Sequence, residues 1–327
     1  MSFGTRHTAS SRTNLLRGIG AATNWVCGQM QGFAAASGGN MTVQQQSFVQ
    51  PVSSRIPVPT TITNVIATLQ GTTTPARYYV VTGHLDSRVT DVLDFTSDAP
   101  GADDDGSGVA VMLELARVFA TVAGEEQGLY GSSFMAAQMA AAGNDVQGMF
   151  SNDIVGASHS FDGHPPDPHT LRLFIEGVPT AATASQISLI QTVGGENFDH
   201  EHQNTQVVGG VQFGDLIDFV DFDYTARVAA VNAATMWALA TNPGTPKGVL
   251  IQTTPPGTLS GTNLTTLSWN ANPESNIARY EVVTRETTAA DWTNAIDAGS
   301  FTAVTLDISA VDTAGRRSPA VFPQVAA

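Results

Sequence analysis

The chain has 327 residues, of which 42% are hydrophobic and 13% are charged, and its formal net charge is −15. This length exceeds that of an average domain, so we expect a large domain followed by a smaller one. The acidic balance argues against nucleic acid and anionic membranes as partners. The single cysteine, Cys27, excludes an intramolecular disulfide and a cysteine-rich zinc site.

No run of 18 apolar residues is present, so no membrane-spanning helix is expected. The first seven residues lack the pattern of a signal peptide, in which charged residues precede an apolar run. The sequence therefore predicts no signal for export. No feature of the sequence specifies an oligomeric state.

Helix and strand patterns alternate through residues 1–241. The spacing of apolar residues predicts helices over 18–36, 106–119, 129–142 and 221–240, and strands over 61–69, 78–82 and 149–155. This alternation predicts an α/β fold, with a three-layer, mostly parallel sheet flanked by helices. In such sheets the functional residues lie at the carboxyl ends of the strands.

The composition changes after residue 241. Residues 242–247 read as a linker of asparagine, proline, glycine, threonine and lysine. Within 248–327, strand-like runs at 263–270, 280–286 and 302–312 follow, with Trp269 and Tyr280 as suitable core aromatics. This tail is predicted to be a small all-β sandwich. It resembles a fibronectin type III module with fewer than the expected seven strands.

A histidine and several carboxylates follow the predicted strands. His84 and Asp86 are two residues apart, so both face the same way. A metal-binding histidine usually needs a carboxylate or a carbonyl on its second ring nitrogen, and Asp86 suits that role. The alternative is a surface histidine beside a helix-capping aspartate. The run 103–105 contains three aspartates directly before a helix, which is more than capping requires, and one of them could bridge two cations.

Glu125 and Glu126 are adjacent carboxylates that follow an apolar, strand-like segment. Burying such a pair in a protein interior is costly unless a cation neutralises the two charges. One can bind metal while the other takes a proton from water. A salt-bridged surface pair is the alternative. Asp153 lies inside an apolar strand, and residues 199–202 offer one or two further imidazoles.

The segments 83–87, 100–108, 123–132, 152–156 and 198–204, in this order, resemble the co-catalytic di-zinc aminopeptidases that include aminopeptidase S and aminopeptidase Y. The resemblance implies that Asp104 bridges two Zn²⁺ ions, which Co²⁺ or Mn²⁺ could replace. His84 and Asp153 would complete one site, and Glu126 and His200 the other.

The same resemblance gives the remaining roles. Glu125 would act as general base and then acid, with Asp86 supporting His84. His200 is favoured over His202 because Asn204 lies four positions after it, where the family has aspartate. The implied activity is removal of N-terminal residues from a peptide substrate by a water held between two zinc ions, and relatives are typically secreted.

The segment before the glutamates is short. A helix over 106–119 rises about 21 Å, and six extended steps back to Glu125 span about 20 Å. Either the helix ends early or the glutamates cannot reach Asp104. Relatives also carry more residues around 193–198. We interpret residues 1–241 as a catalytic domain internally shortened near 119–124 and 193–198. An inactive peptide- or surface-binding module and a carboxypeptidase-type amidohydrolase remain the alternatives.

Overall fold

The computed structural model describes residues 3–115, 118–159, 167–176, 189–193, 200–253, 265–284, 294–297, 306–321 and 323–325. The chain divides into two compact units. The first comprises Met1–Glu176 and Leu189–Ala234, and the second comprises Gly177–Ser188 and Thr235–Ala327. The main division falls between Ala234 and Thr235. The domain boundary at residue 241 stays a prediction.

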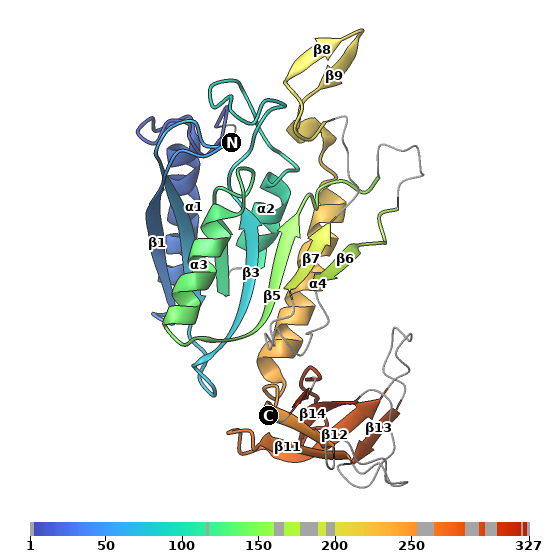
Figure 1. Cartoon of the computed structure of the whole chain (residues 1–327). Helices are drawn as coiled ribbons and strands as arrows, with labels where there is room; N and C mark the ends of the chain where they lie inside the picture. The colour runs from blue at the N-terminus through green and yellow to red at the C-terminus, as the bar shows by residue number, and fades with distance from the viewer. Residues whose placement is uncertain are drawn as a thin grey trace. The chain divides into compact units, whose positions relative to one another are not determined.

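The first unit is built on a seven-stranded sheet with the strand order β1-β2-β4-β3-β5-β7-β6 (Figure 1). Its strands are β1 (Met41–Gln50), β2 (Thr60–Leu69), β3 (Arg77–His84), β4 (Val118–Val122), β5 (Asp145–Asp153), β6 (Arg172–Glu176) and β7 (Leu189–Val193). The central strands β4, β3, β5 and β7 are parallel neighbours. The pairs β1–β2, β2–β4 and β6–β7 are antiparallel, so the sheet is mixed, with a parallel centre.

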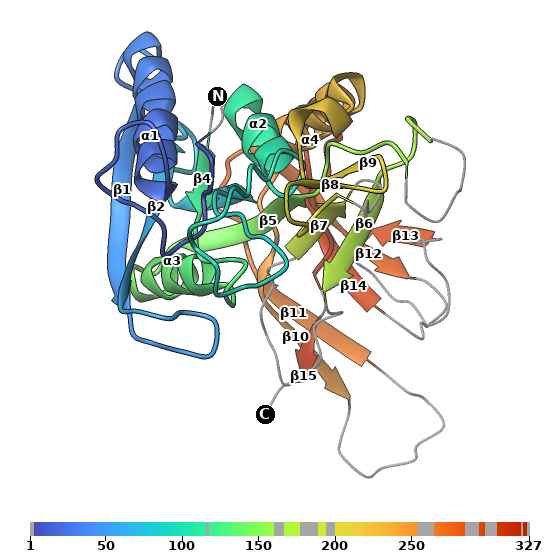
Figure 2. The ribbon, with the colours of Figure 1, turned by 90° about the horizontal axis from the view of Figure 1, so that it is seen from above.

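Helices cover both faces of this sheet, which gives the three layers expected from the sequence. They are α1 (Ile19–Ala36), α2 (Gly106–Leu115), α3 (Tyr130–Ala141) and α4 (Phe222–Thr241). Helices α1 and α2 and the first part of α4 lie on one face, and α3 lies on the other (Figures 1 and 2). None of the described helices has the length and hydrophobicity needed to cross a membrane.

Each face has its own apolar core. On one face, Val111 of α2 packs with Val155 after β5 and with Tyr224 and Val228 of α4. On the other face, Met135 of α3 packs on residues of β3 and β4. The last six residues of β3 are buried without alternation, as is typical of a central parallel strand covered on both sides.

The predicted helix over 106–119 is wrong at its C-terminal end. Helix α2 ends at Leu115, and Val118–Val122 form β4, inserted between β2 and β3. Its valine, phenylalanine and threonine residues favour a strand, and pairing on both edges satisfies its backbone. The early end of the helix allows Glu125 to follow directly from the carboxyl end of a strand.

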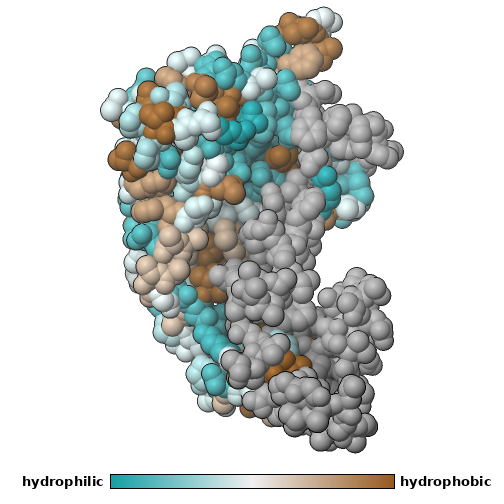
Figure 3. Space-filling view, in the orientation of Figure 1, coloured by the Kyte–Doolittle hydropathy of each residue, from teal (hydrophilic) through white to brown (hydrophobic). Residues whose placement is uncertain are grey.

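A small hairpin, β8 (Gln206–Val208) and β9 (Val211–Phe213), precedes the single turn η1 (Ile217–Phe219). Its two-residue turn consists of Gly209 and Gly210, both with positive φ, as the preferred hairpin turn requires. The hairpin carries exposed valines, and Figure 3 shows its tip as a hydrophobic patch.

The second unit contains two three-stranded sheets, with the orders β11-β10-β15 and β13-β12-β14. Their strands are β10 (Lys247–Thr253), β11 (Thr265–Asn270), β12 (Ile277–Thr284), β13 (Asn294–Asp297), β14 (Leu306–Asp312) and β15 (Gln324–Val325). Trp269 and Tyr280 meet edge to face, with ring centroids 5.3 Å apart, and pack against the buried Val249 and Val282. The small all-β region is confirmed, and its fibronectin type III character stays a prediction.

Candidate metal centre

The candidate site lies at the carboxyl edge of the parallel strands, where such sheets place their functional residues. His84 is the last residue of β3, and Asp153 is the last residue of β5. Glu125 and Glu126 follow β4, and Asp104 lies in the loop that enters α2. Three neighbouring strands and one helix therefore bring together residues that are up to about seventy positions apart in sequence.

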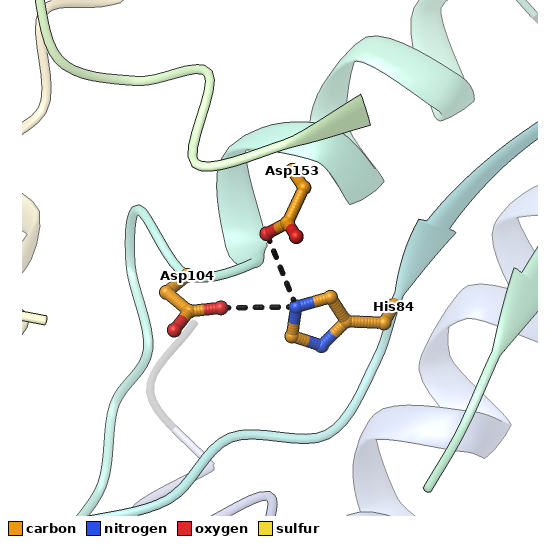
Figure 4. Close-up of side chains that lie close together, drawn as sticks. All are labelled: His84, Asp104 and Asp153. Atoms are coloured by element: carbon orange, nitrogen blue, oxygen red, sulfur yellow. Dashed lines mark ion pairs between the residues drawn. The ribbon is translucent and has the colours of Figure 1, made fainter. Parts of the chain in front are cut away.

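His84, Asp104 and Asp153 form one group of possible metal ligands (Figure 4). The Nε2 atom of His84 lies 2.9 Å from an oxygen of Asp104 and 3.4 Å from an oxygen of Asp153. The other ring nitrogen, Nδ1, lies 3.1 Å from the backbone oxygen of Asp86. His84 and Asp104 are almost completely buried. The sequence predicted these three residues as one set, and the structure brings them together.

Asp104 also belongs to a second group, with Glu126 and His202. The Nε2 atom of His202 lies 2.6 Å from the second oxygen of Asp104 and 3.1 Å from Oε2 of Glu126. Each carboxylate oxygen of Asp104 thus faces a different imidazole. This is the arrangement expected of a carboxylate that bridges two cations.

The predicted imidazole of this second group was His200, and the structure places His202 there instead. His200 stacks on Phe219, with ring centroids 3.5 Å apart and an angle of 15° between the rings. His202 has a positive φ of 55°, within a turn. His200 and His202 lie two residues apart, and both are plausible ligands from the sequence alone. The backbone conformation decides which of them faces Asp104, and no local sequence pattern predicts that conformation. The structure thus brings His202, and not the predicted His200, to Asp104 and Glu126.

The other two aspartates of the triplet bind backbone groups. Asp105 caps α2 by accepting the N–H of Gly108 at 2.8 Å, and it also accepts the N–H of His84 at 2.7 Å. Asp103 accepts the N–H of Gly156 at 2.6 Å, which joins this loop to the segment after β5. The middle aspartate is thus left to face the imidazoles, as predicted.

Asp86 differs from its predicted role. Its carboxylate accepts the backbone N–H groups of Glu125 and Glu126, at 3.2 and 3.1 Å. The nearest carboxylate oxygen of Asp86 is 3.8 Å from Nδ1 of His84, which is too long for a hydrogen bond. Asp86 therefore fixes the turn that carries the two glutamates, while its backbone oxygen orients His84.

The Glu125 side chain is partly buried beside the candidate ligands. Burial raises the pKa of Glu125 to about 7, and the nearby carboxylates of Asp86, Asp153 and Glu126 act in the same direction against His84. A carboxyl with a pKa near neutrality can both take up and release a proton at physiological pH. This is the property that the predicted role of Glu125 requires.

Two buried residues that sequence reasoning missed hold the loops of the site. Asp215 accepts the N–H groups of Asp103 and Asp104, each at 2.8 Å. Arg6 donates to the backbone oxygens of Leu85 and Gly101, at 2.7 and 2.9 Å, and it also donates to that of Pro100. Each contacts a loop that is far from it in sequence, and neither belongs to a motif that marks it.

Comparison with known proteins identifies the family. Residues 64–228, which contain every residue of the two groups, match the model of peptidase family M28. A probable zinc metalloprotease of Leptosphaeria maculans is 40% identical over 401 positions, covering 99% of this chain and 92% of the relative. The chain belongs to peptidase family M28. It is an enzyme of the zinc metallopeptidase class.

A second relative of this M28 peptidase, a probable zinc metalloprotease of Pyricularia oryzae, is 39% identical over 405 positions, covering 98% of this chain and 80% of the relative. Both alignments exceed the 327 residues of this chain, so the relatives carry residues that have no counterpart here. Among solved structures, the LapA aminopeptidase of Legionella pneumophila has a TM-score of 0.51 at 16% identity, covering 74% of this chain and 67% of that one. This likeness shows the fold.

The residues of the two groups fit the zinc that an M28 peptidase uses. Imidazole nitrogens and carboxylate oxygens are suitable zinc ligands. Among the described residues, Oε1 of Glu126 has no hydrogen-bond partner although it is buried, an arrangement that is costly unless a cation is bound. Two carboxylates and two imidazoles lie close around Asp104, and a cation would offset the repulsion between the three carboxylates. Their assignment as ligands stays a prediction.

Proposed function

We propose that this M28 peptidase is an aminopeptidase that uses two zinc ions, one at each ligand group. The observation that carries the proposal is the position of Asp104, whose two oxygens face His84 and His202 separately. One ion would bind His84, Asp104 and Asp153, and the other Asp104, Glu126 and His202. The fold likeness to the LapA aminopeptidase supports an N-terminal cleavage site.

When bound, the two cations would activate a water molecule and stabilise negative charge on the scissile carbonyl oxygen. Glu125 takes a proton from that water as its oxygen attacks the carbonyl carbon. Glu125 then donates the proton to the amide nitrogen as the carbon–nitrogen bond breaks. The products are a free amino acid and a shortened peptide with a new amino terminus.

The chain positions Glu125 for this proton transfer through its backbone. Both oxygens of Asp86 bind the amides of the glutamate pair, so the side chains leave the turn in fixed directions. Arg55 donates to the backbone oxygen of Glu126 at 2.9 Å and holds the same turn from the other side. Such fixed geometry lowers the barrier because the proton acceptor needs no reorganisation.

Glu125→Gln tests the proposal. This variant should retain its zinc and lose about 10²- to 10⁴-fold in kcat, since the amide cannot accept the proton. Glu114→Gln, the same change on the exposed side of α2, should leave kcat unchanged. The measurements are metal analysis and hydrolysis of aminoacyl amides, with and without a chelator. Unchanged turnover in Glu125→Gln with full zinc content would refute the role of Glu125.

The substrate panel decides the type of peptidase. We expect cleavage of peptides with a free amino terminus, no cleavage when that terminus is acetylated, and no effect of amidating the carboxyl terminus. Loss of cleavage after amidation of the carboxyl terminus, with acetylated peptides still cleaved, would instead identify a carboxypeptidase.

A further inference from the structure

Arg88 lies against the second ligand group, directly after the segment that contains His84 and Asp86. Its Nε atom is 2.8 Å from Oε2 of Glu126, and its Nη2 atom is 2.6 Å from Nδ1 of His202. The Arg88 side chain is 16% exposed. A guanidinium therefore contacts two of the three residues that would hold the second cation.

The contact with His202 determines which nitrogen of the ring carries the proton. An arginine N–H can only donate, so Nδ1 of His202 must accept, and the ring proton must be on Nε2. A proton on Nε2 also suits its 2.6 Å contact with Asp104. A cation bound at Nε2 needs the opposite tautomer, whose Nδ1–H would point at the N–H of Arg88. Cation binding and this arginine contact exclude each other.

The first ligand group has the opposite arrangement. Nδ1 of His84 lies against the backbone oxygen of Asp86, and a carbonyl oxygen can only accept a hydrogen bond. The proton of His84 is therefore held on Nδ1, and Nε2 is ready to bind a cation. The two imidazoles have the same chemistry, but one partner is an acceptor and the other is a donor.

Charge acts in the same direction as the tautomer. Arg88 pairs with the Oε2 atom of Glu126 and neutralises a carboxylate that would otherwise attract the second cation. The guanidinium of Arg88 contacts Glu126 and His202, which belong to the second group. Arg88 thus opposes cation binding at that group.

We infer that Arg88 is an internal competitor for the second cation. The group of His84, Asp104 and Asp153 fills first, and the group of Asp104, Glu126 and His202 fills at higher metal concentration, when Arg88 leaves its two partners. Removal of the guanidinium then tightens the second site. This inference rests on the two cation positions of the proposed function and adds the residue that makes them unequal.

Titration of the metal-free full chain with Zn²⁺ by calorimetry, and with Co²⁺ by visible absorption, tests the inference. Wild-type protein should bind in two steps. Arg88→Ala should tighten the second step by about 10- to 100-fold and should leave the first step unchanged. This is the size of the loss usually seen when a residue that orients a metal ligand is removed, with the opposite sign because Arg88 competes with the cation. Arg88→Lys retains the charge but cannot contact Glu126 and His202 at the same time in the way a guanidinium does. Its affinity for the second cation should lie between those of the wild type and Arg88→Ala.

Arg17→Ala is the control, because it also removes a guanidinium but Arg17 lies in an exposed ion pair with Asp98. This variant should leave both steps unchanged. The inference would be overturned if the second step in Arg88→Ala were weaker or unchanged, or if Arg17→Ala tightened it equally. The titration uses no peptide, so tightening in Arg88→Ala without any peptidase activity would refute the proposed function alone. Hydrolysis of peptides with an untightened second step would refute the inference alone.

Discussion

At the scale of single residues, four carboxylates surround the two ligand groups and bind backbone amides. They are Asp86, Asp103, Asp105 and Asp215. A buried carboxylate that accepts two N–H groups positions the loop that carries them, and its removal leaves those donors unsatisfied. The loops of Asp104 and of the glutamate pair are both held in this way. The ligand geometry therefore depends on acids that bind no cation themselves.

Asp215→Asn is expected to weaken zinc binding by about 10- to 100-fold and to lower the free energy of unfolding by about 1–3 kcal/mol. The amide group turns one of the two acceptors of Asp215 into a donor facing an N–H of Asp103 or Asp104. Zinc titration and chemical denaturation measure the two effects. Asp98→Asn, in an exposed ion pair with Arg17, is the control and should change neither. Equal effects in both variants would show that charge, rather than position, matters.

The raised pKa of Glu125 sets the expected pH dependence. Below its pKa the carboxyl is protonated and cannot take a proton from water, so kcat/KM should rise with pH as Glu125 ionises. Burial raises this pKa to about 7, and bound cations lower it, so the rise should lie at or below about pH 7. A profile of kcat/KM against pH checks this. A rate that falls between about pH 5 and pH 7 would contradict the general-base role.

The sequence singled out most of the residues that the structure brings together, because carboxylates and imidazoles beside apolar strand and helix patterns are unusual. His84, Asp104, Glu126 and Asp153 come together as predicted. His202 was missed because two histidines in one turn differ only in backbone conformation. Asp215 and Arg6 act through long-range contacts of about 80 to 112 residues in sequence, which no local pattern encodes.

At the scale of elements, β4 shows the limit of periodicity. The apolar positions of residues 109–119 suit a helix, and Phe119 extends that pattern by one more turn. A five-residue apolar segment also suits a strand with both edges paired, and pairing with β2 and β3 decides between the two. Because α2 ends at Leu115, residues 118–122 can form β4. The carboxyl end of β4 then places Glu125 and Glu126 near Asp104.

Helix α2 packs very closely on the end of β3, at a glycine in the His84 segment. A Cβ atom added to Gly83 would lie 2.7 Å from the backbone of Gly108. We expect Gly83→Ala to lower the free energy of unfolding by about 1–3 kcal/mol and to weaken zinc binding, since His84 and the capping residue Asp105 would shift.

Gly28→Ala provides a control of opposite sign. Gly28 lies in α1, and an added Cβ would have no atom within 4 Å. Alanine in an open helical position stabilises by about 0.5–1 kcal/mol relative to glycine. Thermal unfolding of both variants separates the effects. Equal stability of Gly83→Ala and wild type would show that α2 can move away from β3 without cost.

At the scale of the whole molecule, the residues missing relative to the family do not remove the site. The predicted short junction at 119–124 is accommodated by β4, and the other, at 193–198, lies almost entirely outside the described residues. The family model covers the five residues of the two ligand groups and also Arg88 and Glu125. The strands after residue 247 were predictable from the lack of helical spacing there, whereas their detailed fold family was not, because short strands carry little topological information.

Metal removal should affect the two units differently. All ligands lie in the unit formed by Met1–Glu176 and Leu189–Ala234. A cation that binds only the folded state stabilises it, by about 2.7 kcal/mol when its concentration is 100 times the Kd. In scanning calorimetry, a chelator should lower the unfolding temperature of the first unit and leave that of the second unchanged. Asp104→Ala removes the shared ligand, so added zinc should no longer shift either transition. Equal shifts of both transitions in the wild-type protein would contradict metal binding confined to the first unit.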